Sequence, residues 1–234
     1  VTKAVTAELP KLPTDKQAAL LAALATRGCP VALPAVLTAA KSSEKDVRVA
    51  ALKALGALGN ASVVPALTEA SLASDADVAQ TAQATLAALP GKDVDDAVVA
   101  LLDSKDAKTR ELALDMAGRR HAASAVPVLL KSAEGPDAAV RVGAIKALGD
   151  VATANDMPAL IKLLTSAKSP QEAGAAEKSV SAVCARATNR DACADALVAP
   201  IAKATPETKQ ALLRLLCSVG GAKALQSLRT AAGD

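Results

Sequence analysis

The residues of this chain best suited to chemistry are its four cysteines, because a thiol can act as nucleophile, metal ligand or half of a disulfide. Cys184 and Cys193 flank the segment 185–192, where one helix should end and the next begin. A disulfide there would staple this connection, with a gain on the order of 3 kcal/mol. The alternative is two buried helix cysteines that serve as small apolar side chains. Cys29 and Cys217 lie in distant segments, so we do not expect them to pair.

Residues for hydrolytic or metal-dependent catalysis are scarce. The single histidine, His121, falls at a turn position where a residue that tolerates left-handed backbone geometry is needed. A catalytic triad, a His-based metal site or a cysteine nucleophile would each need further partners. The acidic run 93–96 could suggest a cation site, but acidic residues also suit a helix N-terminus, and we favour that interpretation. We therefore expect no catalytic residues, no metal and no cofactor, and predict that the protein is not an enzyme.

Composition indicates a folded, helical protein. The chain has 234 residues, 51% of them hydrophobic, and contains no Phe, Tyr or Trp. Its apolar residues are mainly Ala, Leu and Val, and alanine is the best helix former. The net charge of +3 is spread along the chain, and the apolar runs 31–40 and 82–90 are far shorter than the roughly 20 residues of a membrane span. We expect no membrane insertion. Because the chain begins Val1-Thr2-Lys3 without Met, we expect that it is a processed product or an excised domain.

The elements that position these residues repeat along the chain. The segment 46–56 (DVRVAALKALG) returns at 139–149 (AVRVGAIKALG), an offset of 93 residues, or three times 31. Steps of 31 residues connect one column of buried-type residues, namely Val47, Val78, Thr109 and Val140. A second column with the same step contains the prolines Pro34, Pro65, Pro127 and Pro158, with Asp96 at the one position between them that lacks proline. Two independent columns therefore support one period.

Each period predicts a pair of helices. The segment 63–73 reads as a first helix, A, with proline in its first turn, and 45–58 reads as a second helix, B, that ends at Gly59. A column of capping residues precedes the A helices, namely Ser62, Asp93, Ser124 and Asn155. One unit needs six extra residues to keep the pattern in register. The predicted single domain, 1–234, then contains the repeats 1–28, 29–59, 60–90, 91–121, 122–152, 153–189 and 190–220, with a terminal helix at 221–231.

The pattern Asp-x-x-Val-Arg-x-x-Ala-x-x-Ala-Leu-Gly followed by Pro-x-Leu resembles the short HEAT-like repeats related to phycobilisome lyases. The resemblance covers nearly the whole chain and is clearest at 46–59 and 137–149. It implies an all-α fold, an α-solenoid of about seven antiparallel helix pairs in a right-handed superhelix, with B helices lining the concave side. It also implies that the arginines of one column, Arg48, Arg110 and Arg141, tie neighbouring repeats together.

The same resemblance implies which residues face a partner. They are the exposed positions of the B helices, and we predict as partner-binding residues Lys53, Gln80, Ala84, Glu111, Asp115, Lys146 and Arg214. Ala22 and Glu177 complete the column of Lys53, whose charges alternate in sign from repeat to repeat. Alternating charges repel a polyphosphate as much as they hold it, and no aromatic side chain is available to stack on bases. We therefore predict a protein or peptide partner rather than nucleic acid, with a merely solvated charge ladder as the alternative.

Three functions remain open at this stage. The first is a non-enzymatic scaffold that binds a protein or peptide on its B-helix surface. The second, by family analogy alone, is a subunit of a chromophore-lyase-like enzyme. The third is a structural spacer within a larger exported protein. A disulfide between Cys184 and Cys193 persists only in an oxidising compartment, and segment 169–191 resembles parts of exported bacterial HEAT-repeat proteins. We expect export to the periplasm, with the cytoplasm as the alternative.

Overall fold

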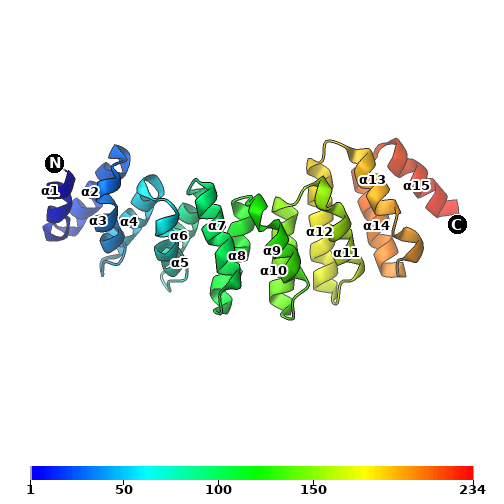
Figure 1. The fold of residues 1–234 in the computed structure, drawn as a ribbon, viewed down its shortest axis with the longest axis horizontal. Coiled ribbons are helices and arrows are strands. Elements are labelled where there is room, and N and C mark those ends of the chain that lie inside the picture. Colours follow the sequence, from blue (N-terminus) through cyan, green and yellow to red (C-terminus); the bar gives the residue numbers. More distant parts are fainter. Residues whose placement is uncertain (1, 234) are drawn as a thin grey trace. The chain divides into compact units, whose positions relative to one another are not determined.

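The structure, a computed structural model, describes residues 2–233 and the side chains of residues 2–230. Within this range all regular structure is helical (Figure 1). The α-helices are α1 (Thr2–Glu8), α2 (Thr14–Arg27), α3 (Leu33–Ala39), α4 (Lys45–Leu58), α5 (Val64–Ser71), α6 (Ala76–Ala88), α7 (Lys92–Ala100), α8 (Ala107–Arg119), α9 (Val126–Ala133), α10 (Ala138–Val151), α11 (Met157–Thr165), α12 (Pro170–Arg186), α13 (Arg190–Val198), α14 (Pro206–Val219) and α15 (Gly221–Gly233). Short 3-10 helices are η1 (Leu9–Lys11), η2 (Pro30–Ala32), η3 (Ala61–Val63), η4 (Leu101–Asp103), η5 (Ala123–Ala125), η6 (Ala154–Asp156) and η7 (Ile201–Lys203).

The helices pair along the chain, which confirms an all-α solenoid. We call the odd-numbered helices α1 to α13 the A helices and the even-numbered helices α2 to α14 the B helices; α15 follows the last pair. Each segment that the period delimits holds one pair. The chain divides into two compact units: unit 1 ends at Met116 and unit 2 begins at Ala117, within α8. The right-handed course of the superhelix stays a prediction, and Val1, included in the first predicted helix, lies outside the described residues.

The B helices start and stop where the sequence indicates. Helix α4 spans Lys45–Leu58, as the apolar spacing predicts. Helix α6 is capped by Asp75 and α10 by Asp137, whose carboxylates accept hydrogen bonds from first-turn amides. Helix α8 is followed by His121, whose φ of 50° confirms the predicted left-handed turn. Gly59 ends α4 for a different reason: its backbone is extended, and a Cβ there would lie 2.5 Å from the Leu55 carbonyl oxygen.

The A helices begin differently from the prediction. Prolines do occupy the first turns of α3, α5, α9 and α11. However, a 3-10 turn precedes each of these helices, so three predicted capping residues, Ser62, Ser124 and Asn155, lie inside 3-10 turns and the cap prediction is wrong. The cap moves upstream because the 3-10 turn exposes its own first amides. Asn60 accepts from the Ser62 amide, and Thr153 forms a capping box with Asp156.

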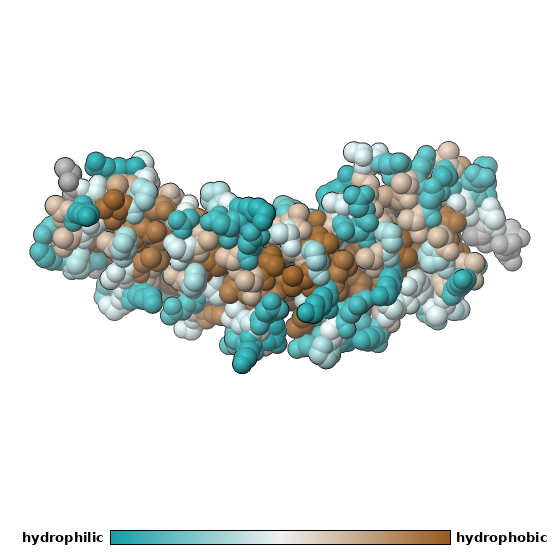
Figure 2. Space-filling model, in the orientation of Figure 1, coloured by the Kyte–Doolittle hydropathy of each residue, from teal (hydrophilic) through white to brown (hydrophobic). Residues whose placement is uncertain are grey.

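Apolar residues fill the space between neighbouring helices. Helix α4 buries Leu52 and Leu55 completely, and it packs against both α2 and α6. In the face shown in Figure 2, apolar residues lie mainly along the middle of the helices, and hydrophilic residues lie mainly toward the helix ends and loops. Glycines allow B helices to approach closely: a Cβ on Gly149 of α10 would lie 2.9 Å from Ser179 Oγ of α12. No helix within residues 2–233 is long and apolar enough to cross a bilayer.

Candidate functional site

A groove runs between the B helices α2 and α4 in unit 1. It has a volume of about 440 Å³ and is lined by Ala22, Ala25, Asp46, Val49, Ala50, Lys53 and Ala54. The lining is built from residues spaced three and four apart on α4, which therefore share one helix face. Apart from Asp46 and Lys53, every lining side chain is apolar and small. The groove thus has an apolar floor with one acidic and one basic residue along α4.

A second groove lies between α4 and α6, on the other side of Lys53. Its volume is about 490 Å³, and its lining consists of Lys53, Gly56, Gln80, Thr81, Ala84, Thr85 and Ala88. Three predicted partner-binding residues, Lys53, Gln80 and Ala84, therefore lie together. The small residues Gly56 and Ala84 leave room that larger side chains would fill. We call the α2–α4 and α4–α6 grooves, with Lys53 between them, the twin groove.

The charges of the twin groove have no partners among the side chains of residues 2–230. Neither the Lys53 ammonium group nor the Asp46 carboxylate makes a hydrogen bond or ion pair in this range, although both side chains are exposed. Their neighbour Lys45 differs, because it forms ion pairs with Asp75 and Asp77 of the next repeat. The pKa of Lys45 is raised, chiefly by its hydrogen bond with Asp77 and then by Asp75. Lys45, beside the twin groove, is therefore paired with carboxylates, whereas Asp46 and Lys53 within the twin groove are not.

In unit 2 the corresponding groove between α12 and α14 contains an ion pair between its two helices. Its volume is about 390 Å³, and its charged lining residues are Glu177, Lys178 and Arg214. Arg214 donates from Nε to Glu177 Oε1 and from Nη2 to Oε2, each at 2.9 Å, a bidentate ion pair. This pair raises the pKa of Arg214. The alternation in sign that the sequence indicates is therefore real here, but the two charges bind each other.

The remaining predicted residues are exposed but line none of these three grooves. Lys146 projects from α10, and Glu111 and Asp115 project from α8. Sequence reasoning missed Asp46, Val49 and Ala50, which line the α2–α4 groove. The signal for them was available, because they precede Lys53 by seven, four and three residues and so occupy the same face of α4.

The arginine column has a different role from the one predicted. Arg48 donates from Nη1 to the carbonyl oxygens of Ser42 and Ser43, each at 2.8 Å, and so ties down the loop that precedes its own helix. Arg110 does the same with Ser104 and Lys105. The hydrogen bonds of both arginines stay within one repeat, so the expected link between repeats is wrong for these two. The residue one period further is alanine or arginine, neither of which offers a carboxylate.

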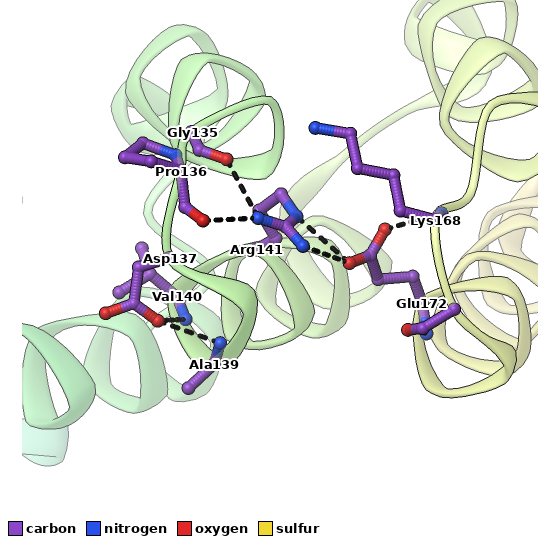
Figure 3. A network of polar contacts seen from close by, with 9 residues as sticks. Gly135, Pro136, Asp137, Ala139, Val140, Arg141, Lys168 and Glu172 are labelled. Carbon is purple, nitrogen blue, oxygen red and sulfur yellow. Dashed lines mark hydrogen bonds and ion pairs between the residues drawn. The ribbon is translucent and has the colours of Figure 1, made fainter.

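Arg141 differs from Arg48 and Arg110, because its side chain reaches Glu172 of the next repeat (Figure 3). Its Nη1 binds the carbonyl oxygens of Gly135 and Pro136, while Nε and Nη2 donate to Glu172 Oε1 at 3.0 and 2.7 Å. The Arg141 and Glu172 side chains are only 10% and 4% exposed. The pKa of Glu172 is lowered, first by the hydrogen bond from the Lys168 amide and then by Arg141, against the opposing effect of burial. This buried ion pair joins α10 to α12.

The acidic run 93–96 makes structural contacts. Asp93 Oδ2 accepts from the Ala61 amide at 3.4 Å, and Lys92 pairs with Asp96 at 2.8 Å. Asp93 lies in the first turn of α7 behind Gly91, so it is not the N-cap residue. Within residues 2–230, no group of three or more His, Cys, Asp or Glu side chains is placed to hold a metal ion.

The predicted cysteine pair is brought together, but as two thiols. All four cysteines are free; Cys184 and Cys193 are buried, Cys29 is half-buried and Cys217 is exposed. The Cys193 side chain lies within interaction distance of the Cys184 thiol. The chain therefore places the two sulfur-bearing side chains against each other across the α12–α13 connection without a covalent bond.

Comparisons with known proteins place these observations among helical repeats. The family model for HEAT repeats matches residues 2–87 and 95–181. No curated protein matches the chain. Among solved structures, a chain of the phycocyanin lyase complex of CpcE and CpcF from Nostoc sp. PCC7120 is 21% identical, with 98% of this chain and 92% of that chain covered and a TM-score of 0.42. The archaeal HEAT-like repeats protein from Thermococcus onnurineus NA1 is 14% identical (94% and 97% covered, TM-score 0.46). Human deoxyhypusine hydroxylase is 19% identical (93% and 84% covered, TM-score 0.43).

Proposed function

The chain belongs to the HEAT repeat family, and we propose that it is a non-enzymatic scaffold that binds a segment of a protein or peptide in the twin groove of unit 1. The observation that carries the proposal is the position of Lys53. Its ammonium group stands between two adjacent grooves and has no partner among the described side chains. A long, charged side chain left unpaired over an apolar floor is available to a ligand.

The dimensions of the twin groove favour a polypeptide over a small molecule. Small-molecule sites are usually single concave pockets that enclose most of the ligand. The twin groove instead crosses three B helices, α2, α4 and α6, and packed helices are about 9 Å apart. Six alanines and Gly56 line it beside Val49, Gln80, Thr81 and Thr85, and the alanines and the glycine allow a partner backbone to approach closely. A helix or extended segment of a protein fits such a shallow, elongated surface.

The charges define the chemistry of that segment. Asp46 and Lys53 are seven residues apart on α4, which corresponds to about 10 Å along the helix axis. A complementary segment carries a basic and an acidic residue with the same spacing. In a helical partner these residues are also seven positions apart, and in an extended partner they are two or four positions apart, because only alternate side chains share one face of a strand. Between them the segment presents small apolar side chains to Val49 and Ala50.

The test is selection of short random peptides displayed on phage against the immobilised chain, followed by affinity measurement with the enriched peptides. We expect the enriched peptides to carry the charge pair described above. Lys53→Glu should weaken their binding by about tenfold or more, because it replaces attraction with repulsion. The matched control is Lys105→Glu, the same change of charge at an exposed site of unit 1 outside the twin groove. Circular dichroism checks that both variants remain helical.

A charge exchange sharpens the test. The double variant Asp46→Lys/Lys53→Glu should bind poorly to the selected peptides and well to versions of them with the acidic and basic residues exchanged. Equal losses in Lys53→Glu and Lys105→Glu would show that only net charge matters and would refute the assignment. Failure to enrich any peptide over an empty support would refute peptide binding and favour a structural spacer.

A further inference from the structure

Two buried thiols face each other where the regular period of the chain breaks. Cys184 lies near the end of α12 and Cys193 in the first half of α13. Their residues are only 4% and 1% exposed, and the Cys184 and Cys193 side chains lie within interaction distance of each other. The binding surface proposed above lies in unit 1 and does not involve this pair, which belongs to unit 2.

Polar contacts hold both sides of the pair in place. Arg186, two residues after Cys184, donates from Nη2 to the carbonyl oxygens of Gly149 and Ala152 at 2.6 and 3.2 Å. These bonds fix the end of α12 to the end of α10. On the other side, Asn189 Oδ1 accepts from the Ala192 amide at 3.0 Å and caps α13. The two thiols therefore meet with little freedom to separate while the helices remain folded.

We propose that Cys184 and Cys193 are a redox pair that closes to an intramolecular disulfide under oxidising conditions and staples α12 to α13. With a small disulfide such as oxidised glutathione, one cysteine thiolate attacks and forms a mixed disulfide while one glutathione thiolate leaves. The second cysteine thiolate then attacks the protein sulfur of the mixed disulfide, and the second glutathione thiolate leaves. The protein loses two hydrogen atoms, and the two glutathione thiolates take up the two protons.

Burial decides when this reaction takes place. Desolvation, and secondarily the neighbouring Cys193, raises the pKa of the Cys184 thiol to about 12. Few thiolates are therefore available in the folded, reduced protein, and an external disulfide reaches them only when the α12–α13 junction opens. Closure during folding, before the helices pack, avoids this restriction. Once closed, the bond is shielded from external thiols by the same burial.

The experiment uses the full chain with Cys29→Ser and Cys217→Ser, so that the pair supplies all the thiols. The denatured, reduced protein is refolded with oxidised and reduced glutathione, and its intact mass is measured. We expect a monomer that has lost two hydrogen atoms and reacts with no thiol reagent after denaturation. In this oxidised form, hydrogen exchange of backbone amides in 185–198 should slow on the order of 100-fold relative to the reduced form, since closing a short loop disfavours local opening.

Control variants distinguish the intramolecular disulfide from glutathione adducts and from disulfide-linked dimers. In the same background, Cys184→Ser leaves one thiol and should yield only a glutathione adduct or unchanged protein, with no slowing of exchange at the junction. Glutathione adducts on both cysteines, or disulfide-linked dimers, as the main product of the pair would overturn the proposal. Closure that leaves hydrogen exchange unchanged or faster would show that the bond strains the junction and is not a staple.

Discussion

Replacing Arg141 with alanine tests whether a buried ion pair couples neighbouring repeats. The substitution removes two hydrogen bonds to the loop carbonyls of Gly135 and Pro136 and two to Glu172 Oε1. It leaves the Glu172 carboxylate, 4% exposed, with the Lys168 amide as its remaining hydrogen-bond donor among the described residues, at 2.9 Å. Removing one partner of a buried ion pair strongly destabilises the folded protein, because the remaining charge stays buried without a counterion.

The magnitude follows from a comparison within the chain. Arg48 makes two equivalent bonds to loop carbonyls but, among the described residues, none to a carboxylate, and its loop carbonyls can be hydrated after truncation. Arg48→Ala should therefore lower the free energy of unfolding by about 1–2 kcal/mol. Arg141→Ala adds the loss of a buried ion pair and should cost about 3–5 kcal/mol. The excess of about 2–3 kcal/mol is the contribution that depends on Glu172.

The assay is urea unfolding followed by circular dichroism, with hydrogen exchange to assign the effect to unit 1 or unit 2, because a stack of repeats need not unfold in one step. A double-mutant cycle of Arg141→Ala and Glu172→Ala isolates the pair and should give a coupling of at least about 2 kcal/mol. If Arg141→Ala and Arg48→Ala cost the same within about 0.5 kcal/mol, the ion pair does not couple the repeats and the reasoning is wrong.

Two further predictions concern the same junction. Gly149→Ala should lower the free energy of unfolding by about 1–3 kcal/mol, because the added Cβ would meet Ser179, whose Oγ is held by hydrogen bonds to the carbonyl oxygens of Ile145 and Ala175. Gly174 of α12 faces open space, so Gly174→Ala should instead raise the free energy of unfolding by about 0.5–1 kcal/mol in the same urea experiment. The pKa of Glu172 is lower in the folded state than in the unfolded chain. The ionised carboxylate therefore stabilises the fold at pH values above its unfolded-state pKa, and this stabilisation is lost as the pH falls through its folded-state pKa. The stability difference between wild type and Glu172→Gln should therefore shrink on acidification in urea titrations at a series of pH values, and a difference that is constant with pH would exclude a role for the carboxylate charge.

The sequence predicts the B helices well because several local signals coincide there. In α4 the apolar spacing, the period of 31 residues and the glycine after Leu58 all indicate the same limits, and the structure has the same limits. The face of Lys53 follows from helix geometry once the limits are known, which is why Gln80 and Ala84 lie in the same groove. In the longer repeat, the pairing of Glu177 with Arg214 shows that the six extra residues follow Glu177.

Other features depend on contacts that the sequence does not specify. The A-helix caps were misplaced because a 3-10 turn and an α-helix start have similar residue preferences, and only the backbone shows that Asn60 is the cap. The link made by Arg141 needs a glutamate one period later, a condition that the arginine column alone does not reveal. Groove volumes depend on how far neighbouring helices approach. Export stays a prediction; of its two grounds, the disulfide and the resemblance to exported HEAT-repeat proteins, the first is not formed in this structure, where all four cysteines are free.

The two units differ in how their repeats are joined, and this difference bears on function. In unit 1 the polar links between repeats include exposed ion pairs such as those of Lys45 with Asp75 and Asp77, which contribute little stability. In unit 2, α10 and α12 are joined by the buried Arg141–Glu172 pair and by Ser179 Oγ, which donates to the Ile145 carbonyl. Buried polar links fix one geometry because breaking them is costly. In the unit 2 groove Glu177 and Arg214 bind each other, whereas in unit 1 Asp46 and Lys53 stay unpaired over an apolar floor, and this contrast supports the binding surface proposed for unit 1.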